Sequence, residues 1–161
     1  MPYSISYHFS QHFCVPARRA YKWCTNYDPQ DLALMHEKGE RAILRVSEDT
    51  IILTDTYCKE NRSISKQKLV QLYPNRFSWI STHLTGPNKY SQFIYELTPE
   101  GNSMSRLDFT GLQIEYSEEE TFNNERIELL ARKLRKEDSA AWKLLAKEME
   151  KELKKDLKKQ Q

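Results

Sequence analysis

Polar and apolar residues alternate along the first part of the chain, from Tyr3 to Phe13. Aromatic and aliphatic side chains fall on one side of this segment, while serines and a histidine fall on the other. A period of two over this length predicts a half-buried β-strand. Pro16 has no amide hydrogen for a neighbouring strand and suits the first turn of a helix, so we expect the strand to end near Val15.

Two short helical segments are predicted after this strand. Apolar residues recur at helical spacing from Ala17 to Cys24, and the sequence Asn26 to Pro29 then interrupts the pattern. Asp28 is suited to cap a second helix that has Pro29 at its first position. The following residues, QDLALM, supply one or two further turns with an apolar face.

Between Gly39 and Tyr116 the pattern changes to a series of strands. β-Branched and aromatic residues form runs of strand length, and turn residues separate the runs at regular intervals. One face of each run is apolar and the other is polar, which predicts a sheet covered on one side. The runs are ERAILRVS, TIILTDTYC, KQKLVQLYP, RFSWISTHL, KYSQFIYEL and SMSRLDFTGLQIEY.

The last part of the chain is predicted to be helical. No glycine or proline occurs between Glu118 and Lys159, and apolar residues recur there at helical intervals. Asp138 and Ser139 prefer helix caps to helix interiors, so we expect a break at this point. Residues 118–136 would then form a separate helix, able to move as a lid over a cavity mouth.

This order of elements predicts an α+β fold. A seven-stranded antiparallel sheet with one covered face must curl around another element. The C-terminal helical region is the only element long enough to lie inside the curl, and the two short helices would close one end. The sequence shows no internal repeat or linker, so residues 1–161 are expected to form a single ligand-binding domain.

Two segments resemble the SRPBCC superfamily, which includes START lipid-transfer domains, the birch-pollen-allergen group and polyketide cyclase and dehydrase-like proteins. FCVPARRAYKWCTNYDPQDL, residues 13–32, resembles the opening strand, Val-Pro-Ala, helix and Tyr-Asp-Pro of that superfamily. TFNNERIELLARKLRKEDSAAWKLLAKEMEKEL, residues 121–153, is similar to its C-terminal helical segment. The resemblance implies the helix-grip fold, with a cavity between sheet and helix for a lipid, polyketide or isoprenoid-like molecule.

The sequence departs from the pollen-allergen branch between the second and third strands. That branch has a glycine-rich loop at this place, where this chain has Ser47 to Thr50, SEDT. This difference argues against the ligands of that branch. The fold alone does not choose between binders, transfer proteins and enzymes, because it hosts all three.

The predicted cavity lining follows from the pleat of each strand. The polar residues expected to face water are Arg45, Lys66, Lys68, Gln92, Glu96, Arg106 and Asp108. This register turns Leu44, Val46, Ile51 and Leu107 inward, and Leu144 of the helix is also expected to face the sheet. The predicted ligand-binding residues are Leu53, Asp55, Tyr57, Leu69, Gln71, Trp79, His83, Phe93, Tyr95, Phe109, Trp142 and Leu145.

These residues favour a binding or carrier protein for a small hydrophobic ligand, because the predicted lining is mostly apolar. The first alternative is a polyketide cyclase or dehydratase-like enzyme that uses Asp55 and His83. A buried carboxylate beside an imidazole raises the pKa of the imidazole and orients its ring, which suits proton transfer. The second alternative is a co-chaperone-like interaction module that works through its outer surface.

Composition narrows the partners. The chain has 39% hydrophobic and 30% charged residues, typical of a soluble globular protein. It has neither a signal-peptide pattern nor an apolar run of about 18 residues, so a cytoplasmic location without a transmembrane segment is expected. The oligomeric state stays open.

Three cysteines match no zinc spacing, so free thiols are expected, with no metal and no cofactor. The lysine-rich C-terminus interleaves glutamates and has no aromatic residue to stack on bases. This pattern indicates a solvated helix end and no nucleic-acid partner.

Overall fold

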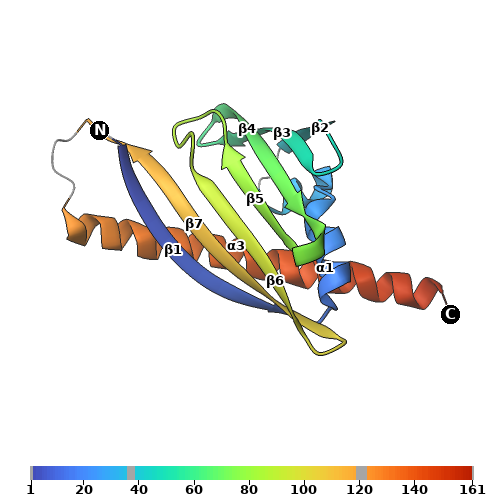
Figure 1. Cartoon of the computed structure of the whole chain (residues 1–161). Helices are drawn as coiled ribbons and strands as arrows, with labels where there is room; N and C mark the ends of the chain where they lie inside the picture. The colour runs from blue at the N-terminus through green and yellow to red at the C-terminus, as the bar shows by residue number, and fades with distance from the viewer. Residues whose placement is uncertain (1, 36–38, 119–122, 161) are drawn as a thin grey trace.

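The structure is a computed structural model that describes residues 2–35, 39–118 and 123–160. Its strands and helices follow the predicted order (Figure 1). The elements are β1 (Pro2–Phe13), α1 (Ala17–Thr25), α2 (Pro29–Met35), β2 (Gly39–Arg45), β3 (Thr50–Lys59), β4 (Arg62–Tyr73), the 3-10 helix η1 (Pro74–Arg76), β5 (Ser78–His83), β6 (Gln92–Glu100), β7 (Met104–Tyr116) and α3 (Asn124–Lys159).

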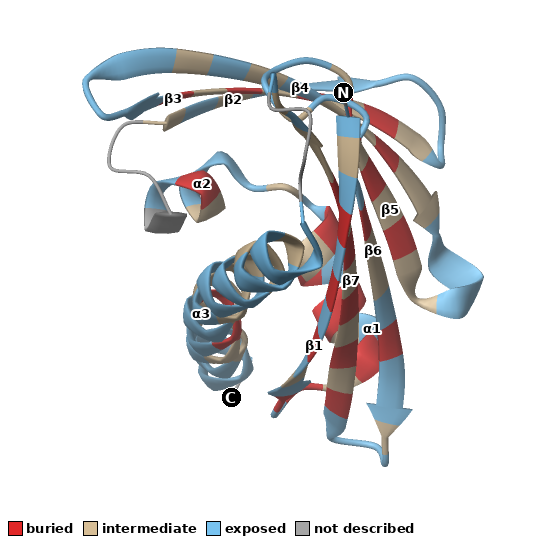
Figure 2. Cartoon of the chain, turned by 90° about the vertical axis from the view of Figure 1, so that its left-hand side faces the viewer, coloured by how far each residue is buried: buried red, intermediate tan, exposed pale blue. Residues whose placement is uncertain are grey.

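Seven strands form one antiparallel sheet in the order β1-β7-β6-β5-β4-β3-β2. Six of them follow one another as a meander, and β1 closes the row by pairing with β7 along its whole length. The sheet curls, and α3 lies along its concave face while α2 sits between α3 and the β2 edge (Figure 2). The predicted sheet around a long C-terminal helix, with two short helices after the first strand, is confirmed.

The core lies between the concave face and the helices. Ile5 and Phe13 of β1 and Leu107 of β7 are fully buried, and α3 contributes Leu145 and Met149. Burial of each such side chain stabilises the folded state by about 1.5–3 kcal/mol of free energy. The predicted inward positions Ile51, Leu53, Leu107 and Phe109 are all part of this buried set.

The two short helices are fastened by polar contacts at their ends. Trp23 of α1 donates its indole N–H to Glu152 of α3, with 2.7 Å between Nε1 and Oε2. The Asp28 carboxylate accepts the amide of Gln30 at 2.9 Å, so the predicted cap at the start of α2 is confirmed. The first contact joins α1 to α3, and the second caps the start of α2.

Helix α3 is unbroken from Asn124 to Lys159, so the predicted break near Asp138 and Ser139 is wrong. Asp138 has a tertiary partner, because its carboxylate accepts the hydroxyl of Tyr7 from β1. Ser139 donates to the carbonyl of Lys136 at 3.2 Å, within the helix. The continuous helix removes the hinge that the predicted lid required, and the residues 119–122 of that predicted segment lie outside the described residues.

On two strands the side chains point to the face of the sheet opposite to the one predicted. Leu44 and Val46, expected inside, are 61% and 57% exposed. On β2 the inward residue is Arg41, which stands opposite Asp55 of β3 and forms an ion pair with it. Because side chains alternate along a strand, this pairing turns Leu44 outward.

The same reversal occurs on β4. Val70 is fully buried, and Lys66 and Lys68, expected to face water, point to the concave side. Leu69 and Gln71 consequently stand on the other face of the strand. On α3, Leu144 is exposed while its neighbour Leu145 is buried, which corrects the expectation that both face the sheet.

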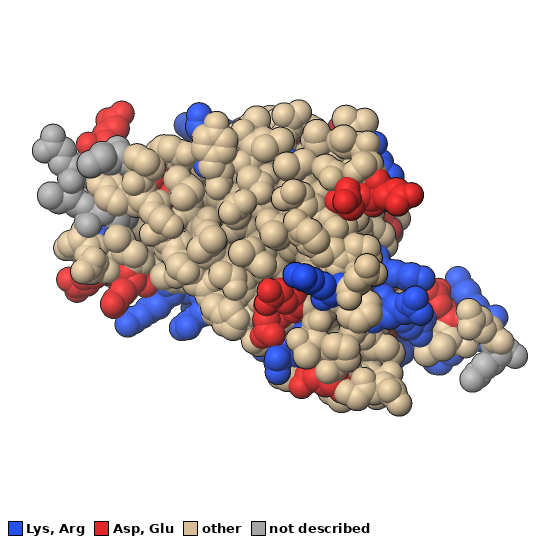
Figure 3. Space-filling model, viewed as in Figure 1, with Lys and Arg blue, Asp and Glu red and all other residues tan. Residues whose placement is uncertain are grey.

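The outer face of the sheet is largely free of charged side chains in the view of Figure 3. Lysine, arginine and acidic residues gather instead along α3 and at the edges of the sheet. Within the described residues, no helix combines the length and the apolar character that crossing a membrane requires.

Gly111 generates the first prediction, because it leaves space for the ring of Tyr7. The two residues are partners across β1 and β7, and a Cβ at Gly111 would overlap the Tyr7 ring. Gly111→Ala should lower the free energy of unfolding by about 1–3 kcal/mol in a urea titration. In a Tyr7→Ala background the same substitution should cost much less, and equal costs in both backgrounds would contradict this explanation.

Candidate functional site

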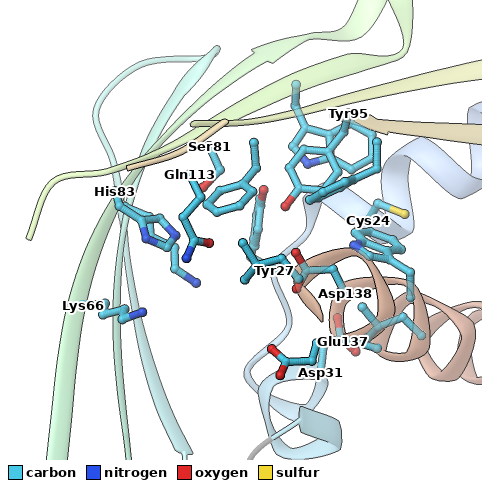
Figure 4. A pocket seen from close by; sticks show the side chains of 18 of the residues that line it. Cys24, Tyr27, Asp31, Lys66, Ser81, His83, Tyr95, Gln113, Glu137 and Asp138 are labelled. Atoms are coloured by element: carbon cyan, nitrogen blue, oxygen red, sulfur yellow. The ribbon is translucent and has the colours of Figure 1, made fainter. Parts of the chain in front are cut away.

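A cavity of about 370 Å³ lies between the concave face of the sheet, α2 and α3 (Figure 4). This is within the size range of small-molecule sites. Its lining comes from every strand of the sheet except β1 and from all three α-helices. Aromatic side chains form one part of it, two groups of opposite charge form two others, and uncharged polar and aliphatic residues complete the lining.

The aromatic part is a continuous set of packed rings. Trp79 and Tyr95 stack with 4.7 Å between ring centroids and 4° between planes. Trp142 of α3 packs against Tyr95 at 5.6 Å, and Phe93 lies 5.9 Å from Phe109. Burial raises the pKa of Tyr95, so its hydroxyl remains a neutral hydrogen-bond donor. Such rings offer a flat apolar surface to a planar guest.

A buried ion cluster forms the basic wall. Arg41 binds Asp55 through two contacts, 2.6 Å from Nε to Oδ1 and 2.9 Å from Nη2 to Oδ2. Lys68 Nζ lies 3.0 Å from Oδ2. Burial acts to raise the pKa of Asp55, but Arg41 and Lys68 outweigh it and hold that pKa below its usual value. Lys59 and Lys66 complete this wall.

An acidic wall stands opposite, formed by Asp31 of α2 and by Glu137 and Asp138 of α3 (Figure 4). Burial and then the neighbouring Asp28 raise the pKa of Asp31 to about 6. Burial also raises the pKa of Asp138, although the hydrogen bond from Tyr7 opposes the rise. The cavity therefore has a positive side on β2–β4 and a negative side on the helices.

His83 of β5 faces the cavity as a neutral imidazole. Burial and the charge of Lys68 lower the pKa of His83 to about 4. Its Nδ1 lies 3.3 Å from the Asn88 side-chain oxygen, and a neutral imidazole has one nitrogen that donates a hydrogen bond and one that accepts.

The acid–base pair of Asp55 and His83 does not form. Among the described residues, the side-chain contacts of Asp55 go to Arg41 and Lys68, and that of His83 goes to Asn88. Lys68 on β4 stands between the two candidates and is the register partner of His83.

The structure gathers part of the predicted ligand set. Seven of those residues line the cavity: Trp79, His83, Phe93, Tyr95, Phe109, Trp142 and Leu145. The other five are not part of the lining: Leu53, Asp55, Tyr57, Leu69 and Gln71. Asp55 nevertheless forms ion pairs with two lining residues, Arg41 and Lys68. Contact of any of these residues with a ligand stays a prediction.

Charged residues are what the sequence reasoning missed. Arg41, Lys66 and Lys68 line the cavity, which is therefore more polar than predicted. The sequence did contain one signal for the observed arrangement. Gln67 and Gln71 are polar residues at odd positions of β4, and this pattern predicts that the odd positions face outward. The lysines at even positions outweighed this signal, because lysine is seldom buried.

Cys24 lines the cavity as a free thiol, and burial raises its pKa well above the usual value. Within the described ranges, no three histidine, cysteine or acidic side chains gather as metal ligands would.

Comparison with known proteins finds relatives by structure only. No protein-family model and no curated protein matches this sequence. The Zhui aromatase/cyclase from Streptomyces sp. R1128 has a TM-score of 0.73 and 13% identity, over 94% of this chain and 96% of that one. Norcoclaurine synthase from Thalictrum flavum, solved with dopamine and hydroxybenzaldehyde, has a TM-score of 0.65 and 12% identity, over 91% and 86%.

The di-domain ARO/CYC StfQ from the steffimycin biosynthetic pathway has a TM-score of 0.70 and 11% identity. The match covers 92% of this chain and 51% of that two-domain protein. Identities this low show a shared fold and nothing more. The chain shares its helix-grip fold with these proteins, which is the fold that the resemblance implied.

The ion cluster generates the second prediction. Asp55→Ala leaves Arg41 and Lys68 uncompensated, and should lower the free energy of unfolding by about 3–5 kcal/mol. The control is Asp108→Ala, which removes the more exposed pair with Arg106. That change should cost at most about 1 kcal/mol. Equal losses in chemical denaturation would show that burial of the cluster has no special effect.

Asp31 generates the third prediction, on pH dependence. Because its pKa is raised on folding, the stability linked to Asp31 is present below about pH 4 and lost as the pH rises through about 6. Asp31→Asn should therefore melt at a higher temperature than wild type at pH 8 and near the wild-type value at pH 4. Asp156→Asn, at an exposed site on α3, should show no such difference. A pH-independent effect of Asp31→Asn would rule this account out.

Proposed function

We propose that the protein binds and carries a compact, planar, largely apolar molecule in the cavity of its helix-grip fold. The observation that carries this proposal is the aromatic part of the cavity, which we call the aromatic floor. There Trp79 stacks on Tyr95, and Trp142 packs against Tyr95. Ring stacking favours a flat guest, such as an aromatic polyketide, over a flexible acyl chain. The volume of about 370 Å³ supports a guest of a few fused rings rather than a long lipid.

A binding role is favoured over the cyclase alternative by the state of the acid–base candidates. Both oxygens of Asp55 are engaged by Arg41 and Lys68, and the carboxylate is not part of the lining. His83 has a pKa of about 4, so it is a weak base at neutral pH. A catalytic role for this pair would need both groups to be released from their partners. No observation on the outer surface favours the co-chaperone alternative.

Binding of a neutral aromatic probe generates the fourth prediction. N-phenyl-1-naphthylamine should bind wild type with increased fluorescence. Trp142→Ala should weaken this binding about tenfold, because it removes one aromatic contact surface. The matched control is Leu144→Ala, an exposed position on the same helix, which should leave binding unchanged.

Thermal melting of both variants separates a lost contact from a lost fold. The proposal is wrong if wild type shows no binding up to the solubility limit of the probe. It is also wrong if Leu144→Ala and Trp142→Ala weaken binding equally while both remain folded, because the probe would then lie outside the cavity.

A further inference from the structure

The basic wall of the cavity has more positive charge than its own carboxylate balances. Arg41, Lys59, Lys66 and Lys68 all line the cavity from β2, β3 and β4. The carboxylate on this wall, Asp55, uses one oxygen for Arg41 alone and shares the other between Arg41 and Lys68. Arg41 and Lys68 are therefore paired with Asp55, and Lys59 and Lys66 are not.

Lys66 is the least compensated of these groups. Among the residues that the structure describes, it has no ion-pair partner within 4.0 Å. Burial lowers its pKa, and the charges of Lys68 and Lys59 lower it further. Glu115 opposes this effect only weakly. A half-buried ammonium without a counter-ion reduces stability, and a bound anion would remove that penalty.

The acidic wall does not supply the missing counter-ion. Asp31, Glu137 and Asp138 lie across the cavity from Lys66, with open space between the two sides (Figure 4). Asp138 is also engaged by the hydroxyl of Tyr7. Lys66 therefore points toward the volume in which a guest would lie.

We infer that the cavity selects a planar aromatic ligand that carries an anionic group, and that Lys66, assisted by Lys59, binds this group. This inference rests on the proposed function and adds the class of ligand. A carboxylate or an ionised enol or phenol on one edge of the ring system has the required charge. The anion would sit beside a half-buried lysine that has no carboxylate within ion-pair distance among the described residues.

The aromatic floor and the basic wall adjoin, so one molecule can reach both. The His83 ring packs against Phe93 with 4.9 Å between centroids. His83 is in turn the register partner of Lys68, which is two residues from Lys66 on the same strand. The neutral imidazole lies between the rings and the ammonium groups, and its unprotonated nitrogen can accept a hydrogen bond from a ligand hydroxyl.

A matched pair of probes isolates the anionic group. 1-Anilinonaphthalene-8-sulfonate has the same rings as N-phenyl-1-naphthylamine plus one sulfonate. Wild type should bind the sulfonate at least about tenfold more tightly than the neutral probe, with a stoichiometry of one, because of the charge-assisted contact. Lys66→Gln should reduce this preference to about twofold or less and leave binding of the neutral probe unchanged.

Lys66→Gln should melt no lower than wild type, because it removes a charge that lacks a partner. The control is Lys22→Gln, which makes the same change of net charge at an exposed position on α1. That variant should retain the full preference for the sulfonate.

Four outcomes would overturn the inference. If wild type binds both probes equally, or if Lys66→Gln keeps the preference, the anion site is wrong while the binding function stands. If Lys22→Gln loses the preference as Lys66→Gln does, the effect comes from net charge and not from this site. If neither probe binds wild type, the proposed function and the inference fail together.

Discussion

The buried contact of Asp55 with Arg41 and Lys68 is the constraint on which the charged side of the cavity depends. A carboxylate with no exposed surface must be paired, so β2 and β4 both turn a cation toward β3. Because side chains alternate, the position of Lys68 also brings Lys66 to the concave side, while Arg41 sends Leu44 outward. One buried charge thereby sets the register of three strands and the positive wall of the cavity.

The other half of the grip is held by packing. Strands β1, β7 and β6 bring aromatic rings against α3, and the hydroxyl of Tyr7 meets Asp138 in the middle of that helix. Gly111 leaves the space that the Tyr7 ring occupies. Aromatic rings line this side of the cavity, whereas the side under β2–β4 is lined by charged residues. The cavity lies where these two kinds of surface meet.

The fold itself says little about the ligand, because a helix-grip domain hosts many activities. Aromatase/cyclases and norcoclaurine synthase share this architecture with the chain at identities of 13% and 12%. The site is more informative, since it combines stacked rings with uncompensated ammonium groups. That combination is the basis on which we propose a planar anion as the ligand and not a neutral lipid.

The sequence by itself determined the elements and their order, because the periods of two and 3.6 and the cap at Asp28 are local properties. It also placed Trp79, Phe93, Tyr95 and Phe109 inside, where aromatic residues alternate with polar ones. Only the tertiary structure decided the register of β2 and β4 and the continuity of α3. Those features depend on partners distant in the chain: Asp55 for Arg41 and Lys68, and Tyr7 for Asp138. A charged residue appears exposed in a sequence pattern until the fold supplies its counter-ion or hydrogen-bond partner.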